Sequence, residues 1–206
     1  MKVLATIAAI VAAGGLSLLL KPRIARAEML KEGDVAPDFS TEAVVGDQTV
    51  ITRLTDYRGR RVVLYFYPKD NTPGCTKEAC AFRDGYAKLQ QWSIAVLGCS
   101  IYGSDAHRAF AGKYHLPFPL LLDPDKRIAR AYGAENGIPI LGLDRRITYV
   151  IGPDGRIAKV YPEVDPATHA SEIIHDLGAD KPPVATSPAA APSPAPPLQP
   201  RDSDME

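Results

Sequence analysis

The sequence predicts an α/β sandwich in which helices flank a mixed central β-sheet. Short runs of β-branched and aromatic residues, typical of buried strands, alternate with longer segments whose apolar residues recur at helical spacing. The order is strand, helix, strand, helix and strand, followed by a short helix, an antiparallel hairpin and a closing helix. A sheet that combines crossover connections with a hairpin is mixed, and helices then cover its faces.

This order of strands and helices matches a thioredoxin-like architecture. The individual elements follow from these patterns and from the prolines and glycines between them. The expected elements are a strand at Arg61–Tyr67, a helix from Pro73 to Gln90 or Gln91, a strand at Ile94–Ser100, a helix at Ser104–Tyr114, a strand at Phe118–Leu122, a short helix ending at Tyr132, hairpin strands at Arg146–Ile151 and Arg156–Tyr161, and a helix at Pro166–Leu177.

A leader of different character precedes this domain. Residues 3–20 form an unbroken run of apolar, glycine and serine residues behind Lys2, and Ala25-Arg26-Ala27 follows the run. This arrangement is typical of a secretory signal cleaved after Ala27, which predicts export to the periplasm or an equivalent lumen. The run is also just long enough to cross a membrane, so an anchor formed by residues 3–20 stays open as the alternative.

The chain ends in a Pro- and Ala-rich segment. Proline removes the amide donors that helices and inner strands need, and the segment has almost no large apolar side chains. We therefore expect a disordered tail. The predicted organisation is a signal peptide or membrane anchor at 1–27, a folded domain at 28–180 and the tail at 181–206.

The composition excludes several classes of function. Lys and Arg number 24, as do Asp and Glu, so the formal net charge is zero and provides no basic surface for nucleic acid. Of the 3 cysteines, Cys99 lies in an apolar strand and is expected to be a core residue. No cofactor or metal is expected, because the histidines do not cluster with cysteines or carboxylates. All four are expected in surface or loop positions: His107, His115, His169 and His175.

Cys75 is the candidate nucleophile. If Thr72 caps the helix and Pro73 begins it, Cys75 lies in the first turn, where backbone amides lack helical acceptors. The positive end of the helix dipole favours a thiolate there, and the thiolate is the nucleophilic form of cysteine. Its attack on a peroxide breaks the O–O bond and leaves a sulfenic acid, which can condense with a second thiol. Cys80, five residues later, is the candidate for that thiol.

The spacing of the two cysteines restricts when they can bond. In a regular helix, the Cα atoms of residues i and i+5 are ~8–9 Å apart, whereas a disulfide requires less than about 7 Å. We therefore expect a regular helix in the reduced protein and an unwound helix start in the oxidised one. The alternative is a purely stabilising disulfide in an exported protein, although so small a loop gains little chain entropy. Arg83, on the same helix, either reaches the rim of this site or is a solvated residue.

The segment around Cys75 resembles the active-site loop of the peroxiredoxin family. The family pattern P-x-x-x-T-x-x-C is matched by Pro68, Thr72 and Cys75, and a second cysteine after five residues resembles the bacterioferritin-comigratory, or peroxiredoxin Q, branch. Residues 146–151, Arg-Ile-Thr-Tyr-Val-Ile, are similar to the family's R-x-T-F-V-I strand. Residues 33–39 are similar to its start, so the resemblance covers about residues 32–177.

The resemblance implies a thiol-specific peroxidase that reduces hydrogen peroxide and organic hydroperoxides. It implies that Cys75 is the peroxidatic cysteine and Cys80 the resolving one, joined in an intramolecular disulfide. Pro68 would shield Cys75 from solvent, the Thr72 hydroxyl would bond the peroxide, and Arg146 would stabilise the thiolate and polarise the peroxide. Thioredoxin or a similar dithiol protein would recycle the enzyme, which is expected to be a monomer.

Two other functions compete with this one. A thiol–disulfide oxidoreductase of the same fold needs a C-x-x-C pair at the helix start, but Thr72 occupies the first of those positions. A non-catalytic module that only holds a partner would leave the joint presence of Pro68, Thr72 and Arg146 unexplained. The sequence therefore favours the peroxidase.

Overall fold

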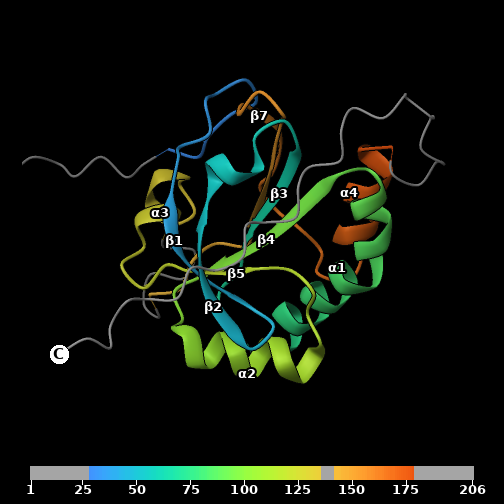
Figure 1. The fold of residues 1–206 in the computed structure, drawn as a ribbon. Coiled ribbons are helices and arrows are strands. Elements are labelled where there is room, and N and C mark those ends of the chain that lie inside the picture. The colour runs from blue at the N-terminus through green and yellow to red at the C-terminus, as the bar shows by residue number, and fades with distance from the viewer. Residues whose placement is uncertain (1–27, 136–141, 179–206) are drawn as a thin grey trace, which may run out of the picture.

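The computed structural model describes residues 28–135 and 142–178, so the predicted leader at 1–27 and tail at 181–206 lie outside the described part. A seven-stranded mixed sheet, ordered β2-β1-β5-β4-β3-β6-β7, carries helices on both faces (Figure 1). The predicted fold class is confirmed. The strands are β1 (Ser40–Val45), β2 (Gln48–Arg53), β3 (Arg61–Phe66), β4 (Ile94–Ser100), β5 (Leu120–Leu122), β6 (Ile147–Ile151) and β7 (Ile157–Tyr161).

The described residues also form four α-helices and one short 3-10 helix, the last of which, α4, follows the final strand. None of the helices in residues 28–135 and 142–178 is long and apolar enough to cross a membrane, and the candidate span at 3–20 lies outside these ranges. The helices are η1 (Leu54–Tyr57), α1 (Pro73–Gln91), α2 (Ser104–Tyr114), α3 (Arg127–Ala131) and α4 (His169–Asp176).

The centre of the sheet explains why β3 and β4 are almost entirely apolar. β3 is parallel to β4 and antiparallel to β6, so that Leu64 lies opposite Leu97 on one side and Tyr149 on the other. Both strands have neighbours on both sides and helices on both faces, so all their residues are buried except Arg61 at the start of β3. The β-branched and aromatic composition that predicted these strands is a consequence of that double burial.

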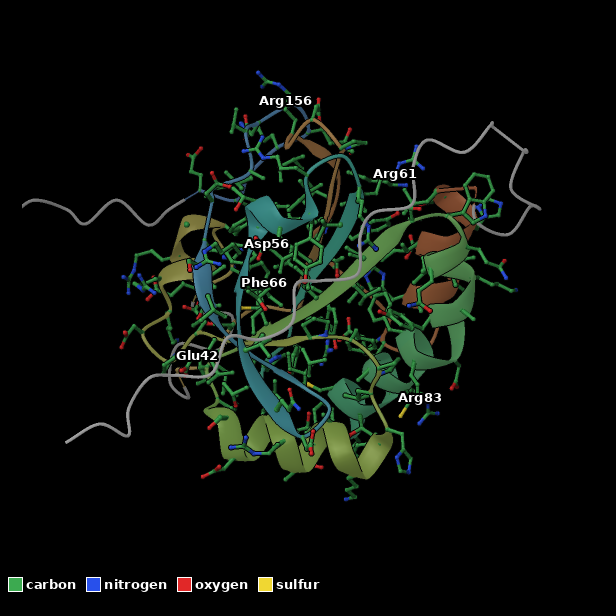
Figure 2. All side chains as sticks on the ribbon, in the orientation of Figure 1. Glu42, Asp56, Arg61, Phe66, Arg83 and Arg156 are labelled. Carbon is green, nitrogen blue, oxygen red and sulfur yellow. The ribbon has the colours of Figure 1, made fainter. Side chains whose placement is uncertain are left out.

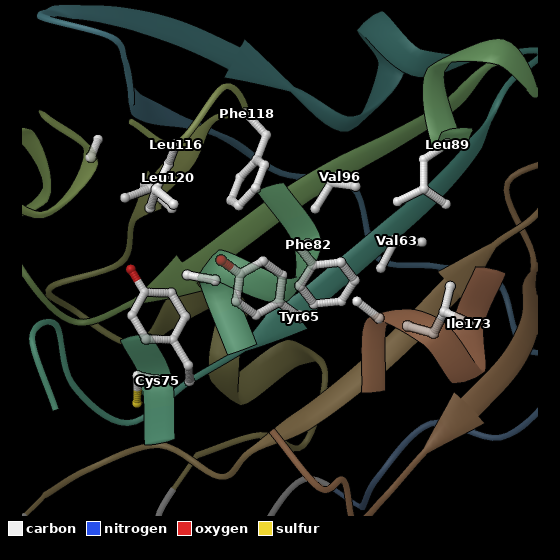
Figure 3. Close-up of a cluster of buried hydrophobic side chains, with 14 of the residues drawn as sticks. Val63, Tyr65, Cys75, Phe82, Leu89, Val96, Leu116, Phe118, Leu120 and Ile173 are labelled. Carbon is white, nitrogen blue, oxygen red and sulfur yellow. The ribbon is translucent and has the colours of Figure 1, made fainter. Parts of the chain in front are cut away.

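Alternate residues of β3 supply two separate cores. Val63 and Tyr65 point to the face covered by α1, α2 and α4, whereas Val62 and Leu64 point to the face covered by α3 and η1. In the first core, the rings of Tyr65 and Phe82 stack with centroids 4.8 Å apart. Figure 3 shows this core, with Cys75 at its border. The helix that carries the candidate nucleophile is therefore held to the sheet by aromatic packing.

The hairpin formed by β1 and β2 is not among the predicted elements. Both strands mix polar and apolar residues, and β2 lies at the edge of the sheet, where one side of the strand is exposed. They therefore lack the apolar runs that identify inner strands. Their connection contains Gly46, whose φ of +63° lies in the left-handed region that glycine adopts readily.

The closing helix begins later than predicted, at His169 rather than Pro166. The Asp165 side chain accepts a hydrogen bond from the Ala167 amide at 2.8 Å, and its carbonyl accepts one from the His169 amide at 3.0 Å. The Thr168 amide also donates to the Asp165 carbonyl, at 3.1 Å, so residues 166–168 form a tight turn that Asp165 caps and that leads directly into the helix.

Candidate active site

Cys75 lies in the first turn of α1, as predicted. Thr72 is the N-cap, with extended backbone angles (φ −84°, ψ 151°), and Pro73 is the first helical residue. The amide of Thr76 donates to the Thr72 carbonyl at 2.9 Å and closes the first helical turn. The amides before it have no helical acceptor, so the helix start favours negative charge beside Cys75, whose side chain is only 2% exposed.

The loop from Pro68 to Thr72 leads from the end of β3 directly to this cysteine. The Thr72 hydroxyl donates to the Lys69 carbonyl at 3.1 Å and does not cap the helix. The predicted hydroxyl cap is therefore wrong, although the predicted cap position is right. A hydroxyl that donates its proton within the loop presents its oxygen as an acceptor. Pro68 and Thr72 are both half-buried.

Arg146 reaches the cysteine from the start of β6, 71 residues further along the chain. Its Nη2 lies 3.2 Å from Cys75 Sγ, and its Nη1 pairs with Oε2 of Glu78. Burial opposes the charge of the guanidinium, but Glu78 and Cys75 outweigh that effect and raise the pKa of Arg146. A Cβ at Gly74 would lie 3.3 Å from Nη2, so this glycine leaves room for the guanidinium.

Glu78 is a member of the site that the sequence analysis missed. Its side chain is fully buried, one turn after Cys75 on α1. Burial raises the pKa of Glu78 from 4.5 to about 7, and the Arg146 guanidinium limits the rise. Oε2 pairs with Arg146, whereas Oε1 has no hydrogen-bond partner among the described residues. The spacing from Cys75 is the signal that could have identified it, because residues three apart share a helix face.

One cation therefore faces two groups that can carry negative charge. Near neutral pH the Glu78 carboxyl is close to the middle of its titration. An ionised Glu78 draws on the Arg146 charge that would otherwise stabilise a thiolate, and a protonated Glu78 leaves that charge to the thiolate. Arg146 is therefore the group through which Glu78 acts on Cys75.

Cys80 is half-buried further along α1, and it is a free thiol, as Cys75 is. The helix is regular across both cysteines, which is the form expected for the reduced protein. Arg83 lies on the outer side of α1 (Figure 2), where it donates to the Tyr114 carbonyl at the end of α2 at 2.9 Å and pairs with Asp84 at 2.8 Å. These contacts hold Arg83 at the ends of α1 and α2 rather than free in solvent, and its predicted reach to the rim of the site stays a prediction.

The expected surface or loop placement of all four histidines is wrong for two of them. His107 and His169 are fully buried, because they lie on the inward faces of α2 and α4, whereas His115 and His175 are exposed. His169 Nε2 lies 2.8 Å from the Thr148 hydroxyl, and burial lowers the pKa of this histidine. Within 28–135 and 142–178, no group of three or more His, Cys, Asp or Glu could hold a metal.

Cys99 is a core residue, as predicted. It lies in β4 with no exposed surface, and burial raises the pKa of its thiol. The charges of Asp123 and Asp144 raise it further. Because the thiolate is the reactive form, Cys99 is an inert thiol, which separates it chemically from Cys75.

Comparisons with known proteins agree with this geometry. A model of the AhpC/TSA family matches residues 33–160. The chain is 39% identical over 153 residues to the putative peroxiredoxin bcp of Coxiella burnetii, covering 72% of this chain and 99% of that protein. It is 36% identical over 150 residues to peroxiredoxin Bcp of Bacillus subtilis, covering 70% of this chain and 93% of that protein.

Solved structures give the same result. A PrxQ from Xylella fastidiosa with a cysteine-to-serine mutation matches with a TM-score of 0.66 and 29% identity, covering 74% of this chain and 98% of that one. Peroxidoxin BcpB of Mycobacterium tuberculosis matches with a TM-score of 0.66 and 31% identity, covering 75% of this chain and 99% of that one. The chain therefore belongs to the AhpC/TSA family, as a peroxiredoxin of the Bcp and peroxiredoxin Q type, and with that family it is a thiol-dependent peroxidase.

Proposed function

We propose that Cys75 reduces hydrogen peroxide and organic hydroperoxides, and that Cys80 resolves the product in the same chain. The observation that carries this proposal is the contact of 3.2 Å between Arg146 Nη2 and Cys75 Sγ at a buried helix start. A permanently charged guanidinium and the unpaired amides of the first turn both stabilise a thiolate. Burial at the border of the core limits the access of water to it.

In the first step, the Cys75 thiolate attacks the terminal oxygen of the peroxide. An S–O bond forms, the O–O bond breaks, and the leaving oxygen departs as water or an alcohol after taking up a proton. The sulfur is oxidised to a sulfenic acid, and the peroxide is reduced. Arg146 stabilises the charge that develops on the breaking bond, and the Thr72 oxygen accepts a hydrogen bond from the peroxide.

In the second step, the Cys80 thiolate attacks the Cys75 sulfur of the sulfenic acid. A disulfide forms and the hydroxyl group leaves as water. The first turns of α1 must unwind for this, because a regular helix holds Cα atoms at this spacing ~8–9 Å apart, beyond the reach of about 7 Å for a disulfide. Thioredoxin or a similar dithiol protein then reduces the disulfide to two thiols and is itself oxidised.

The proposal is tested by the replacement Cys75→Ser, with Cys99→Ala as the matched control. Reduced protein is mixed with one equivalent of hydrogen peroxide, and peroxide loss is followed by stopped flow. We expect Cys75→Ser to consume no peroxide, because a serine hydroxyl supplies no comparable nucleophile near neutral pH, and Cys99→Ala to consume it at the rate of the unmodified chain. Retention of most of the rate in Cys75→Ser would remove Cys75 from the assigned role.

A further inference from the structure

A buried histidine and a buried aspartate meet beneath the loop that precedes Cys75. His107 Nδ1 lies 2.8 Å from Asp70 Oδ2, and both side chains are almost completely inaccessible to solvent. Asp70 belongs to the loop between β3 and α1, and His107 belongs to α2, 37 residues away. Two polar side chains with this burial need mutual satisfaction of their hydrogen bonds.

The other contacts of the pair fix its protons. His107 Nε2 lies 3.2 Å from the Leu121 carbonyl, which can only accept, so Nε2 carries a proton. Asp70 Oδ1 accepts a hydrogen bond from the Tyr67 hydroxyl at 2.8 Å. A single proton then lies between Nδ1 and Oδ2, and all four polar atoms of the pair are bonded.

These contacts tie the active-site loop to three other elements. Through Asp70, the loop is joined to the end of β3 at Tyr67, to α2 at His107 and, one bond further, to β5 at Leu121. The next residue, Asn71, has a φ of +58°, in the left-handed region that asparagine adopts more readily than most other non-glycine residues. Thr72 follows it and begins the helix of Cys75.

We propose that His107 is a positioning residue for the Cys75 loop and acts through its buried hydrogen bond with Asp70. The pair holds Pro68 and Thr72 against the sheet while the first turns of α1 unwind and refold in each catalytic cycle. It does not touch Cys75, and its effect reaches the sulfur through the backbone of the loop. This inference rests on the peroxidase function proposed above.

Two amide replacements of His107 separate its two contacts. The amide of Asn superposes on the Nδ1 side of the ring and can still donate to Asp70, whereas the longer Gln reaches towards the Leu121 carbonyl and loses Asp70. We expect His107→Gln to slow the reaction of Cys75 with peroxide by about tenfold to a hundredfold, the scale for a misplaced reacting group. The rate for His107→Asn should stay within about threefold of the rate for the unmodified chain, as should the rate for His175→Gln at an exposed position.

Rates are measured by stopped flow and divided by the number of titratable Cys75 thiols, so that loss of folded protein does not count as loss of rate. Equal normalised rates for the Gln and Asn variants would overturn the proposal. If His107→Gln does not fold, Asp70→Asn replaces it and should show the same loss. The double variant His107→Gln/Asp70→Asn should react with peroxide no more slowly than either single variant, because both replacements break the same contact.

The protonation of the ring has its own measurement. Nitrogen-15 NMR of the unmodified chain should show a proton on His107 Nε2, as the contact with the Leu121 carbonyl requires, and a bare Nε2 would overturn the assigned contacts. Failure of the proposed function looks different, because the unmodified chain would then not consume peroxide at all. An active unmodified chain with an equally active His107→Gln variant contradicts only the positioning role.

Discussion

Replacement of Glu78 by Gln tests the electrostatic description of the site. The carboxyl is fully buried and its pKa rises from 4.5 to about 7. At ~1.4 kcal/mol for each pH unit, this rise corresponds to about 3 kcal/mol of differential stability between the protonated and ionised forms. Gln keeps the shape of the side chain and cannot ionise, so the comparison isolates the titration.

The sign follows from proton binding. Between pH 4.5 and about 7 the folded protein holds the Glu78 proton and the unfolded chain has released it. The stabilisation that the protonated Glu78 contributes is therefore fully present below pH 4.5 and is lost as the pH rises through about 7. Asp144, whose pKa burial raises to about 6, titrates in both proteins and cancels in the difference. We expect Glu78→Gln to gain about 3 kcal/mol relative to the parent between about pH 4 and pH 8.

The assay is urea unfolding followed by circular dichroism across this pH range, in a Cys75→Ser background that removes the thiol sharing Arg146. The free energy of unfolding is obtained by linear extrapolation at each pH. Glu163→Gln, at an exposed position, is the control and should show a difference that does not change with pH. If the free energies of unfolding of Glu78→Gln and its parent differ by an amount that stays constant with pH within about 0.5 kcal/mol, the raised pKa of a buried Glu78 carboxyl is refuted.

Two further predictions concern the proposed cycle. Cys80→Ser should leave the first turnover intact but block recycling by thioredoxin, so that Cys75 accumulates as a sulfenic acid, which a sulfenate-specific reagent traps; normal turnover with thioredoxin would mean that Cys80 is not the resolving thiol. Arg146→Lys and Arg146→Met should both slow the peroxide reaction by about a hundredfold, the scale for loss of one pre-organised donor. In stopped-flow assays, a Lys variant with full rate would show that charge alone suffices, and a Met variant with full rate would remove Arg146 from the site.

The sequence could predict the residues whose role depends on local structure. The position of Cys75 follows from a cap, a proline and a helix start, all within four residues, and the inner strands follow from apolar runs. The sequence did not identify Glu78 and His107 as buried residues, because a carboxylate in a helix is usually solvated and a histidine is usually accessible. Their burial depends on Arg146 and Asp70, partners that lie 68 and 37 residues away and that only the fold brings near.

His107 nevertheless follows a pattern that was present in the sequence. It lies one turn before Phe110 on α2, and both are on the inward face of that helix. Helical periodicity could therefore have placed it in the core, but no local pattern identifies Asp70 as its partner. The edge hairpin was not predicted because β2 has only two adjacent apolar residues, flanked by polar ones, and so shows no apolar run.

The burial of Glu78 also bears on the conformational change in the proposed cycle. Glu78 lies between Cys75 and Cys80, so it belongs to the segment of α1 that must unwind before the two sulfurs can bond. In the folded helix its ionised form is disfavoured by burial, and contact with water on unwinding removes that penalty. In the proposed cycle, oxidation of Cys75 to a neutral sulfenic acid removes the negative charge that the thiolate places beside Arg146. The folded helix start then loses an ionic contact, while the unwound form gains the hydration of Glu78. Both effects favour unwinding after the sulfur has reacted and when the pH exceeds the raised pKa of Glu78.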